Sequence, residues 1–112
     1  TSAIALFPDF GTPRDSVIDN NLLAGGGYTV YAGEDDATGI KVTNNRFSRL
    51  YYPKGGYWGP GADYANNATG NVWSGNIWDD TGATVSAPIP KDSLDGGEGA
   101  NQCVAGEKNE NC

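Results

Sequence analysis

The apolar positions of the chain recur in a short pattern that occurs three times. In each copy a large apolar residue is followed by two small or polar residues, an Asn, a variable residue and a second large apolar residue. The copies occupy residues 18–23, 42–47 and 73–78, with the shared Asn at Asn21, Asn45 and Asn76. This spacing predicts two short strands that meet at a bend, each with one side chain pointing inward. A helix is disfavoured because Asn and Gly would lie in its middle.

The shift that aligns the first copy with the second also aligns residues upstream of the pattern. It pairs Ile4 with Tyr28, Leu6 with Val30 and Phe7 with Tyr31. The interval between the second and third copies is longer, which indicates an insertion near residues 53–61. Short strands with a period in the twenties are typical of a solenoid. We therefore predict an all-β fold, a parallel β-helix of about three to four coils that stack at strand spacing.

The Asn residues at the bends are predicted to have a structural role. Their amides can hydrogen-bond from one coil to the next, and Asn tolerates the left-handed conformation that such bends need. We expect Asn21, Asn45 and Asn76 to form a ladder in which Asn45 bonds to both neighbouring coils.

The composition divides the chain into a repeat region and a tail. Residues 1–87 carry the predicted coils, with an aromatic loop at 53–68, whereas residues 88–112 are polar and too poor in apolar surface to fold alone. The two Cys, Cys103 and Cys112, lie in the tail of a chain without His. A disulfide between them would stabilise the loop by roughly 2 to 3 kcal/mol. The presence of such a disulfide would indicate an oxidising, extracellular location.

Charge and hydropathy exclude two kinds of partner. The 7 Lys plus Arg against 14 Asp plus Glu give a net charge of −7. This charge opposes binding to nucleic acid and to anionic membranes. No apolar run approaches the roughly 18 residues that a membrane span needs, so membrane insertion is not expected.

The aromatic loop and its neighbours are the main candidates for ligand contact. Aromatic rings can stack on sugars, and cations can pair with uronate groups. The predicted glycan-binding residues are Tyr52, Tyr57, Trp58, Tyr64, Arg49 and Lys54. The alternative is that the rings fold back over the apolar side of the last coils.

Acidic turn residues are a second, weaker candidate site. Asp9, Glu34, Asp35 and Asp36 would lie along one edge of adjacent coils, where Ca²⁺ is the cofactor that carboxylates suit. The competing interpretation is that these turns are simply solvated, because no EF-hand-like or RTX-like spacing is present. No catalytic residue is predicted, since the chain has no His and no second catalytic group can be assigned.

Three segments carry a resemblance to a known family: IDNNLLAGGGY at 18–28, VTNNRF at 42–47 and GNVWSGNIWDDTG at 70–82. They resemble the last coils of secreted bacterial right-handed parallel β-helix proteins, a family similar to pectate-lyase-like polysaccharide-degrading enzymes. The resemblance covers residues 2–85 and implies a right-handed helix in a secreted protein. The family's N-terminal capping helix and earlier coils, which carry most of its substrate groove, have no counterpart in this sequence.

These observations lead to three functional hypotheses. A β-helix end without a cap exposes unpaired strand edges that template pairing. The favoured hypothesis is an extracellular structural module whose open end stacks on further copies of itself, as a filament, or on the rest of a β-helix, and which also contacts polysaccharide. The alternatives are the C-terminal fragment of a secreted polysaccharide lyase or hydrolase, and a non-catalytic carbohydrate-binding module.

Overall fold

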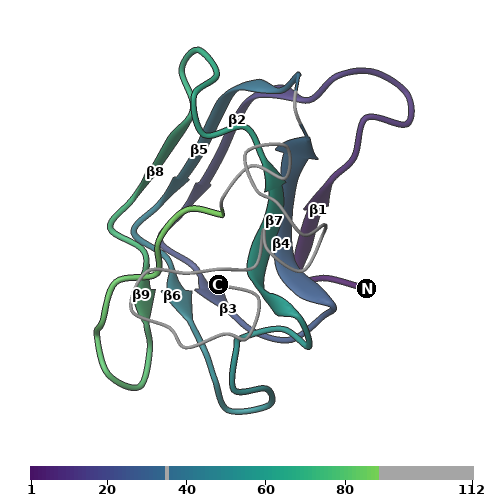
Figure 1. Cartoon of the computed structure of the whole chain (residues 1–112). Helices are drawn as coiled ribbons and strands as arrows, with labels where there is room; N and C mark the ends of the chain where they lie inside the picture. Colours follow the sequence, from purple (N-terminus) through teal and green to yellow (C-terminus); the bar gives the residue numbers. More distant parts are fainter. Residues whose placement is uncertain (35, 89–112) are drawn as a thin grey trace, which may run out of the picture.

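The computed structural model describes residues 1–34 and 36–88, and this part of the chain consists of β-strands joined by turns and loops (Figure 1). The strands are β1 (Ile4–Leu6), β2 (Arg14–Asp19), β3 (Leu22–Leu23), β4 (Tyr28–Glu34), β5 (Thr38–Thr43), β6 (Arg46–Phe47), β7 (Gly59–Tyr64), β8 (Val72–Ser74) and β9 (Ile77–Trp78). The predicted all-β class is confirmed for the described residues. The longest strand has seven residues, because the chain bends after every passage along one side.

The strands form three sheets of three parallel strands each. The orders are β1-β4-β7, β2-β5-β8 and β3-β6-β9, so the chain visits the three sheets in turn and then returns to the first (Figure 1). We call one passage through the three sheets a coil. The first coil is β1 to β3, the second β4 to β6 and the third β7 to β9. Every strand therefore pairs with strands that lie one coil away in the sequence.

The predicted register between the first two coils holds in two sheets and needs a correction in the third. Ile18 pairs with Val42, as the pattern predicts. Ile4, however, pairs with Val30 and not with Tyr28. The reason is the loop between β1 and β2, which is longer than its counterpart between β4 and β5 and shifts the register of β1 relative to the rest of the first coil.

The register between the second and third coils includes the predicted insertion. Val42 pairs with Trp73 in one sheet, and Phe47 pairs with Trp78 in another, as the pattern predicts. In the remaining sheet β4 pairs with β7, and the register shifts once, between Tyr31 and Glu34. The insertion therefore lies before β7, where it leaves the alignment of the following strands unchanged.

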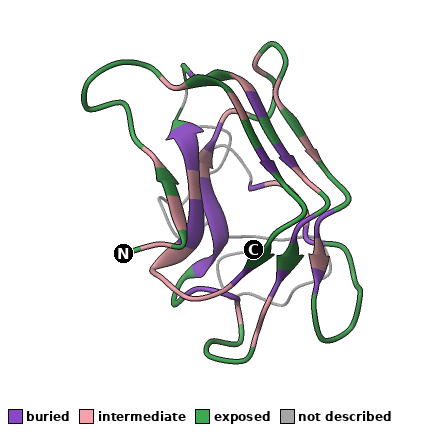
Figure 2. Cartoon of the chain, turned by 180° about the vertical axis from the view of Figure 1, so that it is seen from behind, coloured by how far each residue is buried: buried purple, intermediate pink, exposed green. Residues whose placement is uncertain are grey.

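The side chains that point inward from the three sheets form one apolar core. Its members are Ile18, Leu23, Val30, Ala32, Ala37, Ile40, Val42, Phe47, Tyr64, Trp78 and Val85, with Ile4, Leu6, Trp73 and Ala87 partly buried against them. Strand β4, in the middle of its sheet, is buried along most of its length (Figure 2). In β2 and β5 buried or half-buried residues alternate with exposed ones, whereas β4 and β7 carry consecutive buried residues.

The segment 83–88 covers the core at the third coil and pairs with β9. The Val85 N–H donates to the Asn76 carbonyl oxygen, and the Trp73 indole N–H donates to the Val85 carbonyl oxygen, both at 2.8 Å. The Val85 side chain is buried in the core. The chain turns back after β9, and this segment crosses the end of the core. The tail beyond Pro88, which the sequence predicts to cover this end, lies outside the described residues.

Several predictions lie outside the described residues. They are the disulfide between Cys103 and Cys112 and the tail at 89–112. Within the described ranges, no helix has the length and apolar character to cross a membrane.

Candidate functional site

Asn45 is buried, and its side chain links all three coils. Its Nδ2 donates to the Ile18 carbonyl oxygen at 2.9 Å and to Asn76 Oδ1 at 3.0 Å. Its Oδ1 accepts the backbone N–H of Asn21 at 2.9 Å and the Asn21 Nδ2 at 3.1 Å. The structure thus brings the three predicted ladder residues together at the bend between the second and third sheets.

The residue before each ladder Asn has a left-handed backbone. The φ angles are 59° at Asn20, 56° at Asn44 and 70° at Gly75, values that Asn and Gly tolerate better than other residues. The Thr43 hydroxyl and the Asn44 Nδ2 donate to Asp19 Oδ1 at 2.6 and 3.1 Å. These hydrogen bonds hold the pKa of Asp19 below its usual value. The outer side of the bend is therefore hydrogen-bonded between coils as well.

The ladder is incomplete at the first coil. Asn45 Nδ2 reaches back to Ile18 in the preceding coil, whereas Asn21 Nδ2 donates to the Asp19 carbonyl oxygen of its own coil at 3.0 Å. In the described part of the chain, Asn21 Oδ1 accepts no hydrogen bond, and β1, β2 and β3 each pair with one strand. The first coil therefore presents an open edge. At the third coil the segment 83–88 pairs with β9 and covers the core, whereas β7 and β8 each pair with one strand among the described residues.

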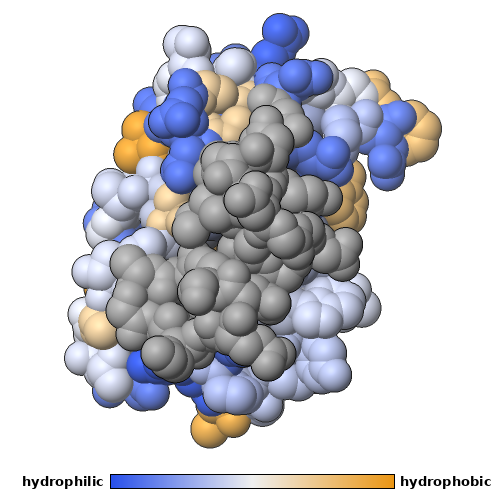
Figure 3. Space-filling view, viewed as in Figure 1, coloured by the Kyte–Doolittle hydropathy of each residue, from blue (hydrophilic) through white to orange (hydrophobic). Residues whose placement is uncertain are grey.

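Six aromatic side chains form a continuous surface array, which we call the aromatic strip. Successive ring centroids are 5.1 to 6.0 Å apart in the order Phe7, Tyr31, Tyr28, Trp58, Tyr57 and Tyr52. The rings come from the end of β1, from β4 and from the insertion that precedes β7. Elsewhere apolar residues are scattered, as on the face in Figure 3, where they show as small patches between polar ones.

The strip contains Tyr52, Tyr57 and Trp58 of the predicted glycan-binding residues, but Tyr64 lies elsewhere. Tyr64 is buried in the core, and its hydroxyl donates to the Ile40 carbonyl oxygen at 3.3 Å. Burial raises the pKa of Tyr64 to about 12. The predicted ligand contact at Tyr64 is therefore corrected to a packing role, because β7 turns this ring inward.

Of the two predicted cations of this site, Arg49 is placed away from the strip. The Arg49 guanidinium lies 4.3 Å from the centre of the Trp78 ring and pairs with Asp80 at 3.0 Å. This hydrogen bond from Arg49 lowers the pKa of Asp80. Lys54 is half-buried, and its backbone bridges to Gly56. Arg49 is thus engaged at the third coil.

The acidic turn residues predicted for calcium are not gathered into one site. Asp9, Glu34 and Asp36 are exposed, and Asp35 lies outside the described residues. Within residues 1–34 and 36–88, no group of three or more His, Cys, Asp or Glu is close enough to hold a metal ion. A calcium site stays a prediction.

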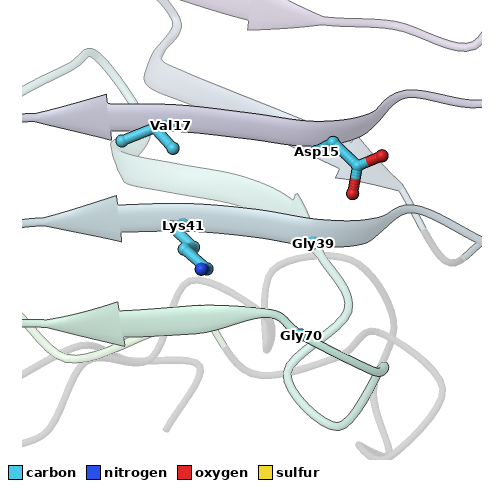
Figure 4. Close-up of a pocket in the computed structure, with 5 residues that line it drawn as sticks. All are labelled: Asp15, Val17, Gly39, Lys41 and Gly70. Atoms are coloured by element: carbon cyan, nitrogen blue, oxygen red, sulfur yellow. The ribbon is translucent and has the colours of Figure 1, made fainter.

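A groove of about 320 Å³ lies on the outer face of the sheet β2-β5-β8 (Figure 4). Asp15, Val17, Gly39, Lys41 and Gly70 line it. Asp15, Gly39 and Gly70 follow one another in successive coils with φ of 53°, 67° and 76°. The two glycines lack side chains, which leaves the groove between Asp15 and Lys41. It offers one carboxylate and one ammonium group, which is too little to define a reaction.

Sequence reasoning missed four residues of these arrays. Phe7, Tyr28 and Tyr31 belong to the strip, and the available signal was that aromatic residues recur near the first strand of successive coils, although Tyr31 pairs with Ala5 and not with Phe7. Asn71 accepts the Ile40 N–H at 2.8 Å and donates to the Ala37 carbonyl oxygen at 3.0 Å. No repeat signal marks Asn71, because the residue one coil earlier is Ile40.

Comparison with known proteins gives no match to this chain among family models, curated proteins or solved structures. Functional assignment therefore depends on the geometry of the open edge and of the aromatic strip.

Proposed function

We propose that the chain is a structural end unit of a parallel β-helix whose first coil stacks on a further coil of the same kind. The observation that carries this proposal is that the core is covered at the third coil and only partly covered at the first, where Ile4 and Leu6 are half-buried. Segment 83–88 buries Val85 over the third coil. At the first coil, Asn21 Oδ1 and one edge of each strand lack a partner among the described residues. Proteins avoid leaving such edges bare.

A further coil would supply what the open edge lacks. Its strands would add in parallel to β1, β2 and β3. An Asn at its bend would donate its backbone N–H and Nδ2 to Asn21 Oδ1, as Asn21 itself does to Asn45 Oδ1. The half-buried side chains of Ile4 and Leu6 would be covered as well. A few hundred Å² of apolar surface at about 25 cal/mol per Å² contributes on the order of 5 to 10 kcal/mol before association costs.

The further coil would come from other coils of a longer β-helix or from a second copy of this chain. A second copy would meet the first coil edge to edge, because segment 83–88 covers the third coil. This contact is closed by two-fold symmetry and stops at a pair. The two-fold axis sets the facing strands antiparallel, so the parallel pairing and the Asn contact described above require other coils of a longer β-helix. The head-to-tail filament expected from the sequence is therefore replaced in the proposal by a pair of chains.

The end-unit function also fits the alternative that the chain is the C-terminal part of a secreted polysaccharide lyase or hydrolase. In that case the catalytic groups would belong to other coils. The secreted location remains a prediction, since it depends on Cys103 and Cys112.

Sedimentation velocity and amide hydrogen exchange of the purified chain test the proposal. At micromolar concentrations we expect a concentration-dependent pair of chains, in which β1 to β3 exchange more slowly than in the monomer. Leu6→Lys places a charge at the open edge and should abolish the pair, whereas Leu50→Lys, the same change at an exposed loop residue, should preserve it. A monomer whose β1 to β3 amides are protected as strongly as those of β4 to β6 would contradict an open edge. Long polymers would contradict a closed third coil.

A further inference from the structure

The aromatic strip is not explained by the packing of the core. Trp58 and Tyr57 remain 51% and 65% exposed, although their rings contact each other and their neighbours. Aromatic side chains contribute most when buried. Exposed rings that are gathered into one contiguous area, and not scattered singly, mark an interaction surface.

Glycines beneath the strip hold its central ring in place. A Cβ atom at Gly27 would lie 2.7 Å from a carbon of the Trp58 ring and 3.2 Å from the Tyr31 hydroxyl. The backbone N–H groups of Tyr57 and Trp58 donate to the carbonyl oxygens of Gly26 and Gly27, each at 2.8 Å. The rings are therefore ordered before a ligand arrives, which lowers the entropic cost of binding.

The composition of the strip selects the kind of ligand. Five of the six rings, four Tyr and one Trp, carry a polar group at one end. Such side chains suit a surface that is apolar on one part and hydrogen-bonded on another. A sugar ring has this character, with C–H groups on its faces and hydroxyls at its rim. The aliphatic side chains that a lipid or an apolar helix would favour are not part of the strip.

Charge further restricts the ligand to a neutral one. The guanidinium groups of Arg46 and Arg49 pair with Asp79 and Asp80 at 3.2 and 3.0 Å. The six strip residues carry no charge, Lys54 is the one charged residue between Tyr52 and Tyr57, and the whole chain carries a net charge of −7. A polyanion would be repelled by this field. An acidic glycan is therefore disfavoured.

We propose that the aromatic strip binds a neutral polysaccharide chain that runs from the first coil across β4 to the insertion before β7. This site goes beyond the predicted aromatic loop, because it includes Phe7, Tyr28 and Tyr31 and excludes Tyr64 and Arg49. It lies on the outer surface and does not require stacking at the first-coil edge.

Affinity electrophoresis in gels that contain a soluble polysaccharide tests this site. Hydroxyethyl cellulose, glucomannan and mixed-linkage β-glucan are the neutral probes, and polygalacturonate is the acidic one. The matched variants are Tyr57→Ala, inside the strip and 65% exposed, and Tyr51→Ala, outside it and 70% exposed. We expect at least one neutral probe to retard the unmodified chain and Tyr51→Ala equally. Tyr57→Ala should bind about 5- to 10-fold more weakly.

Gly27→Ala adds a second variant, which keeps every ring of the strip but displaces Trp58. It should weaken retardation by a similar factor, while circular dichroism reports an intact sheet content. The proposal is overturned if no neutral probe retards the chain, if polygalacturonate alone does so, or if Tyr57→Ala and Tyr51→Ala bind equally. It is also overturned if Tyr57→Ala dissociates a pair of chains without changing glycan binding, because the strip would then contact a second copy.

Discussion

The two consecutive residues at each bend have different roles, although in the first and second coils both of them are Asn. Asn44 accepts a left-handed backbone and hydrogen-bonds on the outer surface. Asn45 has its side chain inside, where the amide joins the first and third coils. The amide suits this position because it has a donor and an acceptor at one end of a short side chain. A hydrophobic residue would leave buried backbone groups without partners.

At this scale we predict that Asn45→Ala lowers the free energy of unfolding by about 1 to 3 kcal/mol. The Ile18 carbonyl oxygen and the Asn21 N–H lose their partner in this variant. Asn45→Asp should be at least as harmful, because a carboxylate cannot donate to Ile18 or to Asn76 Oδ1. Urea denaturation followed by tryptophan fluorescence measures both changes. The control is Asn67→Ala at an exposed loop position, and equal stability of the Asn45 and Asn67 variants would disprove the role of the ladder.

The elements themselves are too short to be stable alone. Strands β3, β6 and β9 have two residues each, fewer than the usual length of a strand. They persist because bends fix their direction and because each lies against a strand of the next coil. The left-handed residues that form these bends are Asn20, Asn44 and Gly75. Gly75 has no room for a side chain, because a Cβ atom there would collide with Asn44 Oδ1. The bend, more than the strand, is the unit that the sequence repeats.

At the element scale, replacing Asn44 separates backbone preference from hydrogen bonding. Asn44→Gly and Asn44→Ala both remove the amide that donates to Asp19. The φ of 56° penalises Ala but not Gly. We expect the Gly variant to be more stable than the Ala variant by about 0.5 to 1 kcal/mol in chemical denaturation. An Ala variant as stable as the Gly variant would show that the bend has relaxed to another conformation.

The whole molecule has two unlike ends. Trp73 and Trp78 lie at the third coil, under the chain that returns through Val85. Ile4 and Leu6 lie at the first coil, where β1 has one neighbouring strand among the described residues. Because the core is covered at the third coil and only partly covered at the first, the proposed stacking takes place at the first coil.

At this scale we predict that Val85→Asp opens the closed end. The charge cannot remain in the core, so the segment 83–88 should detach and the free energy of unfolding should fall by about 2 to 4 kcal/mol. Trp73 and Trp78 would lose their cover, and tryptophan emission should shift to longer wavelength. Thr84→Asp, at an exposed neighbouring position, should change neither quantity. An unshifted emission in Val85→Asp would mean that other residues close this end.

The sequence is sufficient to predict the repeat, the all-β class and the ladder positions. It could do so because an inward residue recurs once per coil, and because Asn and Gly mark the backbone conformation at a bend. The same local rules placed Ile18 against Val42 correctly. They failed for Ile4, since the length of the β1–β2 loop, which carries no periodic signal, sets the register of β1.

Which side chains meet across coils depends on the tertiary structure. Tyr57 and Tyr64 lie in one aromatic stretch of the sequence, yet one ring is exposed and the other buried. The difference arises because strand β7 turns Tyr64 inward, while the insertion before it follows the surface past Gly27. Phe7 and Trp58 likewise enter one strip from distant positions because the chain returns to the same sheet in every coil. Contacts of this kind depend on stacking and loop length, which hydrophobic periodicity does not encode.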